Sequence, residues 1–173
     1  MSDIDLMESV LTATADVLDG VPAGALGHPT LCTEFDVAAL RDHILAASQM
    51  FTRAAGAEPS GGFREDGART VAAWREHGTD RPVTIRLGEV PGTQAVCMTI
   101  VEFATHGCEL AVATGQRVPY RDGDLEQALA IGRRTLPDRF RGPGQAFGFA
   151  VAVRDDAPPW QRLLGFAGRE VGA

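Results

Sequence analysis

The first part of the chain carries hydrophobic residues at helical spacing. Over residues 4–19 the apolar side chains fall three or four positions apart, which predicts an amphipathic helix, and Gly20 and Pro22 end the pattern. After a loop over 20–32, a second helix is expected over about 34–55. Thr33 would be its N-cap, with the Asp36 carboxylate reaching back as in a capping box. A third helix is predicted over 63–77, where Val71 and Trp74 lie three apart.

The pattern changes after Pro82. Residues 83–87 alternate and are rich in β-branched side chains, and 88–92 hold turn residues, so we expect a short hairpin that lies on the helices. The longest and most apolar helix is predicted over about 93–114, and a fifth over about 124–136, before Pro137. An alternating stretch over 147–153 and a short helix over about 158–168 follow.

These elements predict a mainly α fold in a single domain over residues 1–173. We expect a helical bundle with a short β-hairpin and a small C-terminal addition of strand and helix. A length of 173 residues is about one domain's worth.

The amino-acid composition argues against some classes of function. With 16 basic and 23 acidic residues the net charge is −7, which argues against a general nucleic-acid binder. No apolar run approaches the roughly 20 residues that span a bilayer, and the acidic N-terminus lacks the basic region of a signal peptide. We therefore expect a cytoplasmic protein without a membrane partner. All the basic residues are Arg, and Lys and Asn are absent, which indicates a GC-rich genome.

Candidate chemistry begins with Glu102 and His106. Lying four residues apart, they share one helix face with Glu109 and several small or apolar residues. Burying ionisable groups in such a stripe is costly unless a partner satisfies them, and a metal ion is one such partner. An i, i+4 pair can supply two ligands to one divalent ion.

A third ligand would come from another helix. His43 lies on a face of the second helix that is otherwise almost entirely apolar, and a histidine that points into a bundle core suits a site built from facing helices. The alternatives are a hydrogen-bonded core histidine and an ExxxH pair that arose by chance on a solvated face. Cys108 points away from His106 and is expected to be a small buried hydrophobe. Cys32 lies near the start of the second helix, a position that can lower the pKa of a thiol.

Three motifs resemble one known family. They are the segment from Pro29 to Val37 with Leu40 and His43, the segment from Val101 to Gly115 that contains Glu102, His106 and Glu109, and Arg141-Gly142-Pro143-Gly144 with Phe147-Gly148. In this order they are similar to the mycothiol-dependent maleylpyruvate isomerase-like branch of the DinB/YfiT-like superfamily. The resemblance implies a DinB-like four-helix bundle with a divalent metal held by His43, Glu102 and His106. It also implies a structural role for Cys32, which lies in the first motif.

The resemblance also has limits. Phe35 and Cys108 stand where the branch has Trp, and Glu109 stands where it has Asp. We expect no counterpart of the isomerase's additional C-terminal domain, so its reaction is not transferred. Glu109, one turn beyond His106, is expected to support the site, to bind substrate or to act as a catalytic general base.

Two histidines and one carboxylate would leave a tetrahedral Zn²⁺ with an open fourth position, although Ni²⁺ and Fe²⁺ also suit this ligand set. The leading hypothesis is a transferase or isomerase that uses this metal and a small-molecule thiol, mycothiol, on a small electrophile. A metal-dependent hydrolase and a non-catalytic metal- or ligand-binding protein remain alternatives. A homodimer is left open.

Overall fold

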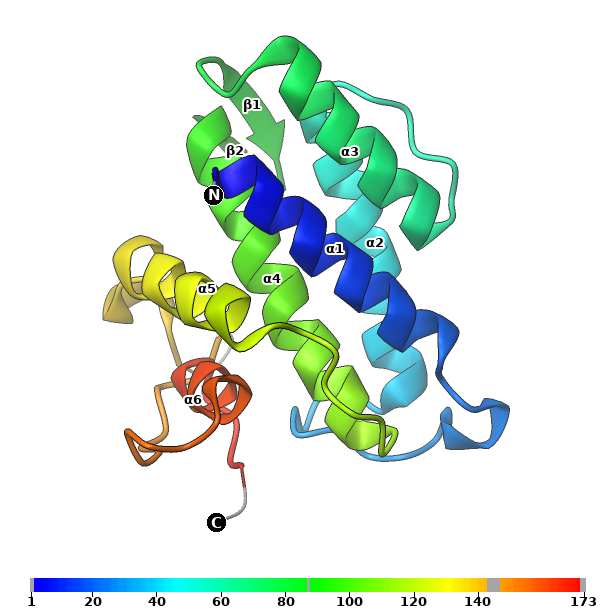
Figure 1. Ribbon diagram of the computed structural model, residues 1–173, viewed down its shortest axis with the longest axis vertical. Helices are drawn as coiled ribbons and strands as arrows, with labels where there is room; N and C mark the ends of the chain where they lie inside the picture. The colour runs from blue at the N-terminus through cyan, green and yellow to red at the C-terminus, as the bar shows by residue number, and fades with distance from the viewer. Residues whose placement is uncertain (1, 87, 143–146, 172–173) are drawn as a thin grey trace.

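The computed structural model describes residues 2–86, 88–142 and 147–171, and it is mainly helical (Figure 1). The described helices are α1 (Asp3–Asp19), α2 (Val37–Ala55), α3 (Phe63–His77), α4 (Gly92–Ala113), α5 (Asp122–Thr135) and α6 (Pro159–Phe166). Two short 3₁₀ helices, η1 (Ala23–Ala25) and η2 (Asp138–Phe140), and two strands, β1 (Pro82–Ile85) and β2 (Gly88–Pro91), complete the regular structure. The predicted mainly α fold with a β-hairpin is confirmed.

Four helices form a bundle. α1 packs against α3 and α4, and α2 packs against the same two helices, so the four close a ring around one core. The aromatic ring of Phe103 on α4 lies at the centre, edge-on to Phe51 of α2 at 5.9 Å and to Phe63 of α3 at 5.2 Å between ring centroids. Such edge-to-face pairs add to the stabilisation that burial alone provides. The helix that carries Glu102 and His106 is thus fixed against its neighbours.

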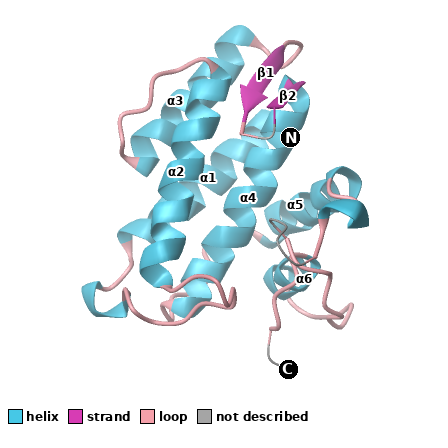
Figure 2. Ribbon diagram, turned by 180° about the vertical axis from the view of Figure 1, so that it is seen from behind, coloured by secondary structure: helices cyan, strands magenta, loops and turns pink. Residues whose placement is uncertain are grey.

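α5 and α6 lie outside this ring. Both pack against α4, on the side away from α2 and α3, and they also pack against each other (Figures 1 and 2). Their contact with α4 brings the C-terminal part of the chain beside the helix that carries Glu102 and His106. α4 is therefore covered from both sides.

The start of α2 differs from the expected one. Its N-cap is Asp36, whose carboxylate accepts a hydrogen bond from the Ala39 amide at 2.8 Å, and the helix begins at Val37. The Thr33 cap and a start at 34 are wrong, because the preceding residues make other bonds. The Phe35 amide donates to the Cys32 carbonyl, and Pro29 pairs with Asp36 in an isolated bridge. An extended turn therefore occupies the place of the first predicted helical turn.

The hairpin lies in the predicted region, but residues 88–91, for which the sequence predicts the turn, form its second strand, β2. β1 and β2 are antiparallel, with Val83 opposite Val90. Val83 and Ile85 are buried against α2 and α4, which gives the two strands the support that an isolated hairpin lacks. β1 begins one residue before the predicted strand and ends at Ile85, and Leu87 lies outside the described residues.

The predicted C-terminal strand is wrong. Phe147 makes only an isolated bridge to Arg141, and residues 148–153 form no strand. The Val151 amide donates instead to the carbonyl of Gly165 in α6. Among the described residues, no strand lies beside this stretch with which it could form a ladder of hydrogen bonds. Pro143 and Gly144 of the third motif lie outside the described residues.

A buried polar cluster sets the distance between α1 and α4. The Tyr120 hydroxyl lies 2.7 Å from the Thr14 hydroxyl and donates to the Phe103 carbonyl at 3.2 Å. It sits directly over Gly107, where a Cβ atom would come within 1.7 Å of the Tyr120 oxygen. Only glycine leaves room for this arrangement at position 107.

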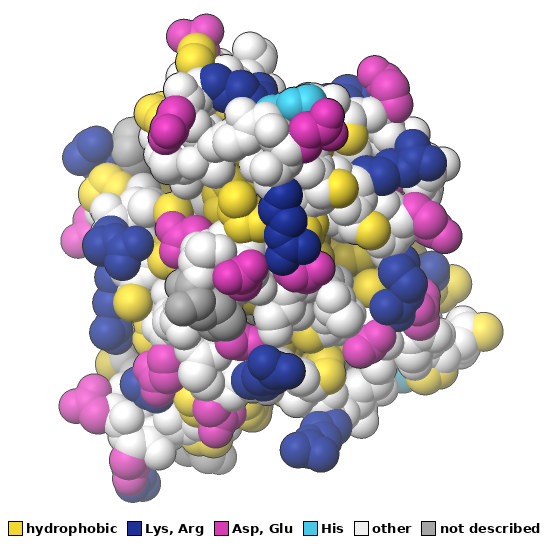
Figure 3. Space-filling model, turned by 45° about the horizontal axis from the view of Figure 1, so that its top comes forward, with side chains coloured by type: hydrophobic (Ala, Val, Ile, Leu, Met, Phe, Trp, Pro, Cys, Tyr) yellow, Lys and Arg dark blue, Asp and Glu magenta, His cyan; other side chains and the backbone are white. Residues whose placement is uncertain are grey.

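The expectation that no apolar run approaches the length of a membrane span is wrong for α4, which is long and apolar enough to cross a membrane. However, 83% of its most apolar 18-residue stretch is buried inside the protein. A buried helix of this kind is typical of the core of a soluble protein. On the face in Figure 3, arginine and acidic side chains are interspersed and do not gather into patches of one sign.

Candidate metal centre

The side chains of His43 and Glu102 meet across the interface between α2 and α4. His43 Nε2 lies 2.8 Å from Glu102 Oε1, within hydrogen-bond distance. Because α2 and α4 are neighbours in the bundle ring, a residue on each can face the other. The prediction that His43 faces Glu102 is confirmed.

His106 completes the group one turn further along α4. Its Nε2 atom lies 3.7 Å from Glu102 Oε1, and its ring is edge-on to that of His43, with centroids 4.7 Å apart. One potential ligand atom from each of His43, Glu102 and His106 lies within 4.8 Å of the others. These three residues are called the triad below. The sequence predicted this convergence from the i, i+4 spacing on α4 and from the apolar face of α2.

The donor set of the triad fits a divalent transition metal. Two imidazole nitrogens and one carboxylate oxygen are ligands that Zn²⁺ takes at about 2.0–2.2 Å. Around one tetrahedral ion such atoms lie about 3.4 Å apart, close to the 2.8 Å and 3.7 Å separations from Glu102 Oε1. Small side-chain movements would therefore bring the triad to metal-binding geometry.

The triad is open to solvent on one side. The exposed fraction of the side chain falls from 31% at His43 through 18% at Glu102 to 4% at His106. The Phe35 ring lies against His43, with centroids 5.2 Å apart. The face of α2 around His43 is less buried than predicted, because Ala46 on the same face is exposed. A small molecule can therefore approach the triad from the His43 side.

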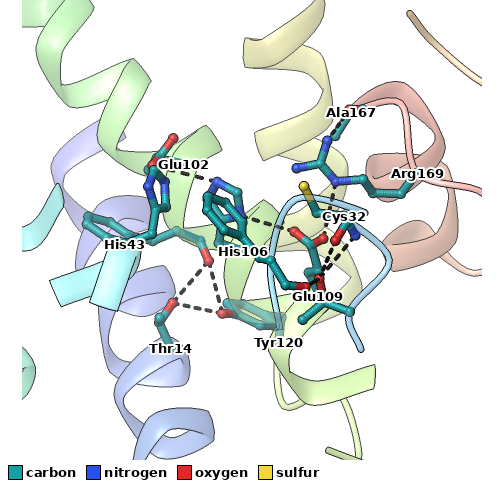
Figure 4. Close-up of polar contacts among 12 residues, drawn as sticks. Thr14, Cys32, His43, Glu102, His106, Glu109, Tyr120, Ala167 and Arg169 are labelled. Carbon is teal, nitrogen blue, oxygen red and sulfur yellow. Dashed lines mark hydrogen bonds and ion pairs between the residues drawn. The ribbon is translucent and has the colours of Figure 1, made fainter. Parts of the chain in front are cut away.

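Glu109 lies on the other side of the His106 ring (Figure 4). Its Oε2 atom is 3.1 Å from His106 Nδ1, and its Oε1 atom accepts a hydrogen bond from Arg169 Nε at 3.3 Å. The Glu109 side chain is 0% exposed. Both carboxylate oxygens are thus engaged inside the protein, and this geometry favours a supporting role for Glu109 over that of a base in contact with substrate.

The charges of this cluster stabilise one another. Burial alone would raise the pKa of Glu102, but His106 and His43, with a smaller effect of Arg86, hold that pKa below its usual value. Burial opposes the charge of His106, yet Glu102 and Glu109 raise its pKa. Burial also opposes the charge of Glu109, whose pKa is nevertheless lowered by His106 and Arg169. These shifts favour ionised carboxylates beside a protonated His106 ring and the Arg169 guanidinium.

Sequence reasoning missed Arg169. No motif marks it, and it lies 60 residues from Glu109 along the chain. The aromatic contact of Phe35 with His43 was also not anticipated, although the first motif contains both residues.

The three cysteines lie outside the triad. Cys108 is buried, and burial strongly raises the pKa of its thiol, in agreement with the expected role as a small hydrophobe. Cys97 is also buried, whereas Cys32 is partly exposed. The Cys32 carbonyl accepts hydrogen bonds from the Thr30 hydroxyl and the Phe35 amide, which fits the expected structural role.

Two surface hollows lie away from the triad. One is lined by residues 79–82, 89–91 and Thr93, at the hairpin and the start of α4. The other lies between α1 and α3 and is lined in part by Leu11 and Val71. Neither hollow is lined by a residue of the triad.

Comparison with known proteins gives two relatives from Mycobacterium tuberculosis. They are uncharacterized protein MT0763 of strain CDC 1551 / Oshkosh and uncharacterized protein Rv0738 of strain ATCC 25618 / H37Rv. Each is 31% identical to this chain over 169 residues, which cover 92% of this chain and 93% of the relative. The chain belongs to the family of these two proteins. No family model and no solved structure matches it.

Proposed function

We propose that the protein is a member of the mycothiol-dependent maleylpyruvate isomerase-like branch of the DinB/YfiT-like superfamily. Two independent observations support this assignment. The three sequence motifs occur in the order of that branch, and the two motifs that supply His43, Glu102 and His106 meet in space at the triad. The convergence of these three donors is the observation that carries the proposal.

The triad would hold a divalent metal, with zinc first and nickel or iron as alternatives. When bound, such an ion would supply Lewis-acid chemistry that lowers the pKa of a coordinated thiol or water. We propose that the protein uses this chemistry with a small-molecule thiol, mycothiol, as a transferase or isomerase acting on a small electrophile. The partners are then small molecules, and the cytoplasm is the expected location.

The residues of this chain have separate tasks in this proposal. His43 and Glu102 form the partly exposed side of the triad, so they border the space from which thiol and electrophile approach. His106 lies deeper and is held on its far side by Glu109. Because both Glu109 oxygens are engaged by His106 and Arg169, we assign Glu109 to positioning and not to proton transfer with the substrate.

One observation favours a second candidate, a metal- or ligand-binding protein without turnover. A nearby general base would favour turnover, and both oxygens of Glu109, the candidate base, are engaged by His106 and Arg169 inside the protein. A metal-dependent hydrolase is the nearest enzymatic rival, because the same donor set can activate water.

Metal content and thiol conjugation, measured on one preparation without a histidine tag, test the proposal. We expect about one equivalent of zinc, nickel or iron per chain and conjugation of mycothiol to members of a panel of small electrophiles. Metal-loaded protein that conjugates nothing across the panel would favour the binding-protein candidate. Hydrolysis of an ester or amide panel without thiol would favour the hydrolase. Protein that takes up none of the three metals would overturn the metal centre itself.

A further inference from the structure

We infer that Arg169 is a positioning residue of the metal centre: acting through Glu109, it fixes the His106 ring and makes metal affinity depend on the C-terminal segment. The inference rests on the proposed function, because it assumes that the triad binds a metal. Arg169 follows α6, and its guanidinium reaches the metal centre only through Glu109: the hydrogen bonds and ion pairs of the described residues join it to neither His43 nor Glu102.

Glu109 forms a bridge between His106 and Arg169. One carboxylate oxygen faces His106 Nδ1 at 3.1 Å, and the other accepts the Arg169 Nε hydrogen at 3.3 Å. The Glu109 side chain is fully buried, and the side chains of His106 and Arg169 are only 4% and 7% exposed. Water therefore cannot easily replace either partner, and the position of the carboxylate depends on both.

The two ring nitrogens of His106 face different carboxylates. An ionised carboxylate only accepts hydrogen bonds, so Nδ1 of His106 must carry the hydrogen that faces Glu109. The Nε2 atom then faces Glu102 Oε1, at 3.7 Å, inside the triad. A carboxylate that holds one ring nitrogen of a histidine orients the other nitrogen toward a metal, and losing such a partner typically costs 10–100-fold in metal affinity.

Arg169 is itself held in place by the backbone at the end of α6. Gly168 has φ of +87°, a conformation that favours glycine, and the chain reverses there at the end of α6. The Arg169 amide donates to the Leu164 carbonyl at 2.9 Å, and its Nη1 atom donates to the Ala167 carbonyl at 2.9 Å. The guanidinium is thus aimed back at α4, toward Glu109.

The third sequence motif anchors the same helix end. Arg141 donates through Nη1 to the carbonyls of Gly148 and Phe166, and its guanidinium lies over the Phe166 ring at 3.9 Å from the centroid. Gly148 in turn packs against Gly168, where a Cβ atom at position 168 would lie 2.7 Å from the Gly148 Cα. A continuous set of contacts therefore leads from Arg141 through the end of α6 to Arg169, Glu109 and His106.

The test replaces Arg169 and uses a matched control in the same segment. Arg169→Met keeps a long apolar stem and removes the donors. Arg162→Met is the control, because Arg162 on α6 also pairs with one carboxylate, Glu126, and one carbonyl, Ala157, but does not reach Glu109. The Zn²⁺ affinity is measured by competition with a chromophoric chelator. The unfolding of the metal-free proteins by urea is measured in parallel.

We expect Arg169→Met to weaken Zn²⁺ binding by at least about 10-fold and Arg162→Met to leave the affinity unchanged. Arg169→Lys, which keeps a cationic donor, should recover part of the loss. On a Glu109→Gln background, Arg169→Met should have little further effect, since the bridge is already broken. Equal zinc affinity in Arg169→Met and wild type, or equal losses in Arg169→Met and Arg162→Met, would overturn the inference.

A readout without metal separates this inference from the proposed function. In the metal-free protein at alkaline pH, ¹⁵N NMR of the His106 ring should show the hydrogen on Nδ1 in wild type and a mixture of both tautomers in Arg169→Met. If wild type binds no Zn²⁺, the proposed function fails, and an unchanged tautomer in Arg169→Met rejects the positioning role as well. If Arg169→Met does not fold, the same comparison is made with Arg169→Lys.

Discussion

Glu102 and Glu109 face opposite nitrogens of one imidazole: Glu102 Oε1 lies 3.7 Å from His106 Nε2, and Glu109 Oε2 lies 3.1 Å from His106 Nδ1. Both carboxylates come from α4, one turn before and one turn after the histidine. Only the first is partly exposed, at 18% against 0%. Two similar residues on one helix therefore have different surroundings, and their substitution should have different effects.

Removing either histidine of the triad should remove the metal and leave the fold. In His43→Ala or His106→Ala, the two donors that remain hold a divalent ion poorly, so we expect metal content to fall below about a tenth of wild type. Helical circular dichroism should be retained, because the helices pack through an apolar core of other side chains, although loss of the buried His106 ring leaves a cavity that lowers stability. The measurement is elemental analysis after dialysis. His77→Ala is the control, because His77 is an exposed histidine at the end of α3. Undiminished metal content in His106→Ala would rule out the triad as the metal site.

Glu109→Gln should lower metal affinity by about 10-fold. If Glu109 were instead a general base, the variant would keep its metal and only turnover would fall. A glutamine offers one acceptor and one donor group, whereas His106 and Arg169 both present donors to this position. One donor is therefore left facing another. Titration with Zn²⁺ checks this result. Unchanged affinity together with a 100-fold lower conjugation rate would restore the general-base role.

Chelation should lower the melting temperature but keep a single cooperative transition. An extensive apolar core around Phe103 holds the helices together, so folding does not depend on the ion as it does in a zinc finger. At a metal concentration 100-fold above Kd, binding stabilises the protein by about 2.7 kcal/mol, which corresponds to a shift of several degrees. Calorimetry with and without EDTA measures it. Loss of the helical circular dichroism on chelation would contradict this prediction.

The stability of the metal-free protein should depend on pH on both sides of a maximum. Folding lowers the pKa values of Glu102 and Glu109. Their contribution to the free energy of unfolding is therefore present above about pH 4.5, the pKa of a free carboxyl, and is lost as pH falls through the lowered pKa. The pKa of His106 is raised, so its contribution is complete below about pH 6.5 and is lost as pH rises through the raised pKa.

Urea unfolding of metal-free wild type and of His106→Gln between pH 3 and pH 9 tests this dependence. The difference in free energy of unfolding between the two proteins should be largest between about pH 4.5 and 6.5. A difference that keeps growing toward pH 9 would show that His106 is not stabilised as a cation by its two glutamates.

The cysteines should react at different rates with a thiol reagent. Cys32 is partly exposed, whereas Cys97 and Cys108 are buried and burial raises the pKa of both thiols. With DTNB we expect one fast equivalent in the native protein and three in urea. Cys32→Ser should abolish the fast phase, and a fast reaction of two thiols in the wild type would contradict the buried position of Cys108.

The triad was accessible to sequence reasoning because its geometry is mostly local. Glu102 and His106 are fixed by the i, i+4 spacing on one helix, and His43 needed only the additional prediction that two helices face each other. Arg169 was not accessible, because its contact with Glu109 depends on the reversal at Gly168 and on the docking of α6, neither of which has a periodic signal.

The two errors in the fold also have tertiary causes. Thr33 and Asp36 are both good N-cap residues, and the choice between them is made by the bridge between Pro29 and Asp36. Residues 147–153 have the alternation of a strand, but a strand needs a neighbour, and the Val151 amide bonds to a helix end instead.

The contact of Tyr120 with Gly107 has a consequence for how this protein can change over evolution. Gly107 directly follows His106, and the Tyr120 hydroxyl occupies the space that a Cβ atom at position 107 would need. Any larger residue at position 107 would therefore push α4 away from α1. Such a displacement would alter the depth of the neighbouring imidazole relative to α2. Substitutions at 107 and 120 should therefore be tolerated only as a pair, in which a smaller residue at 120 makes room for a larger one at 107.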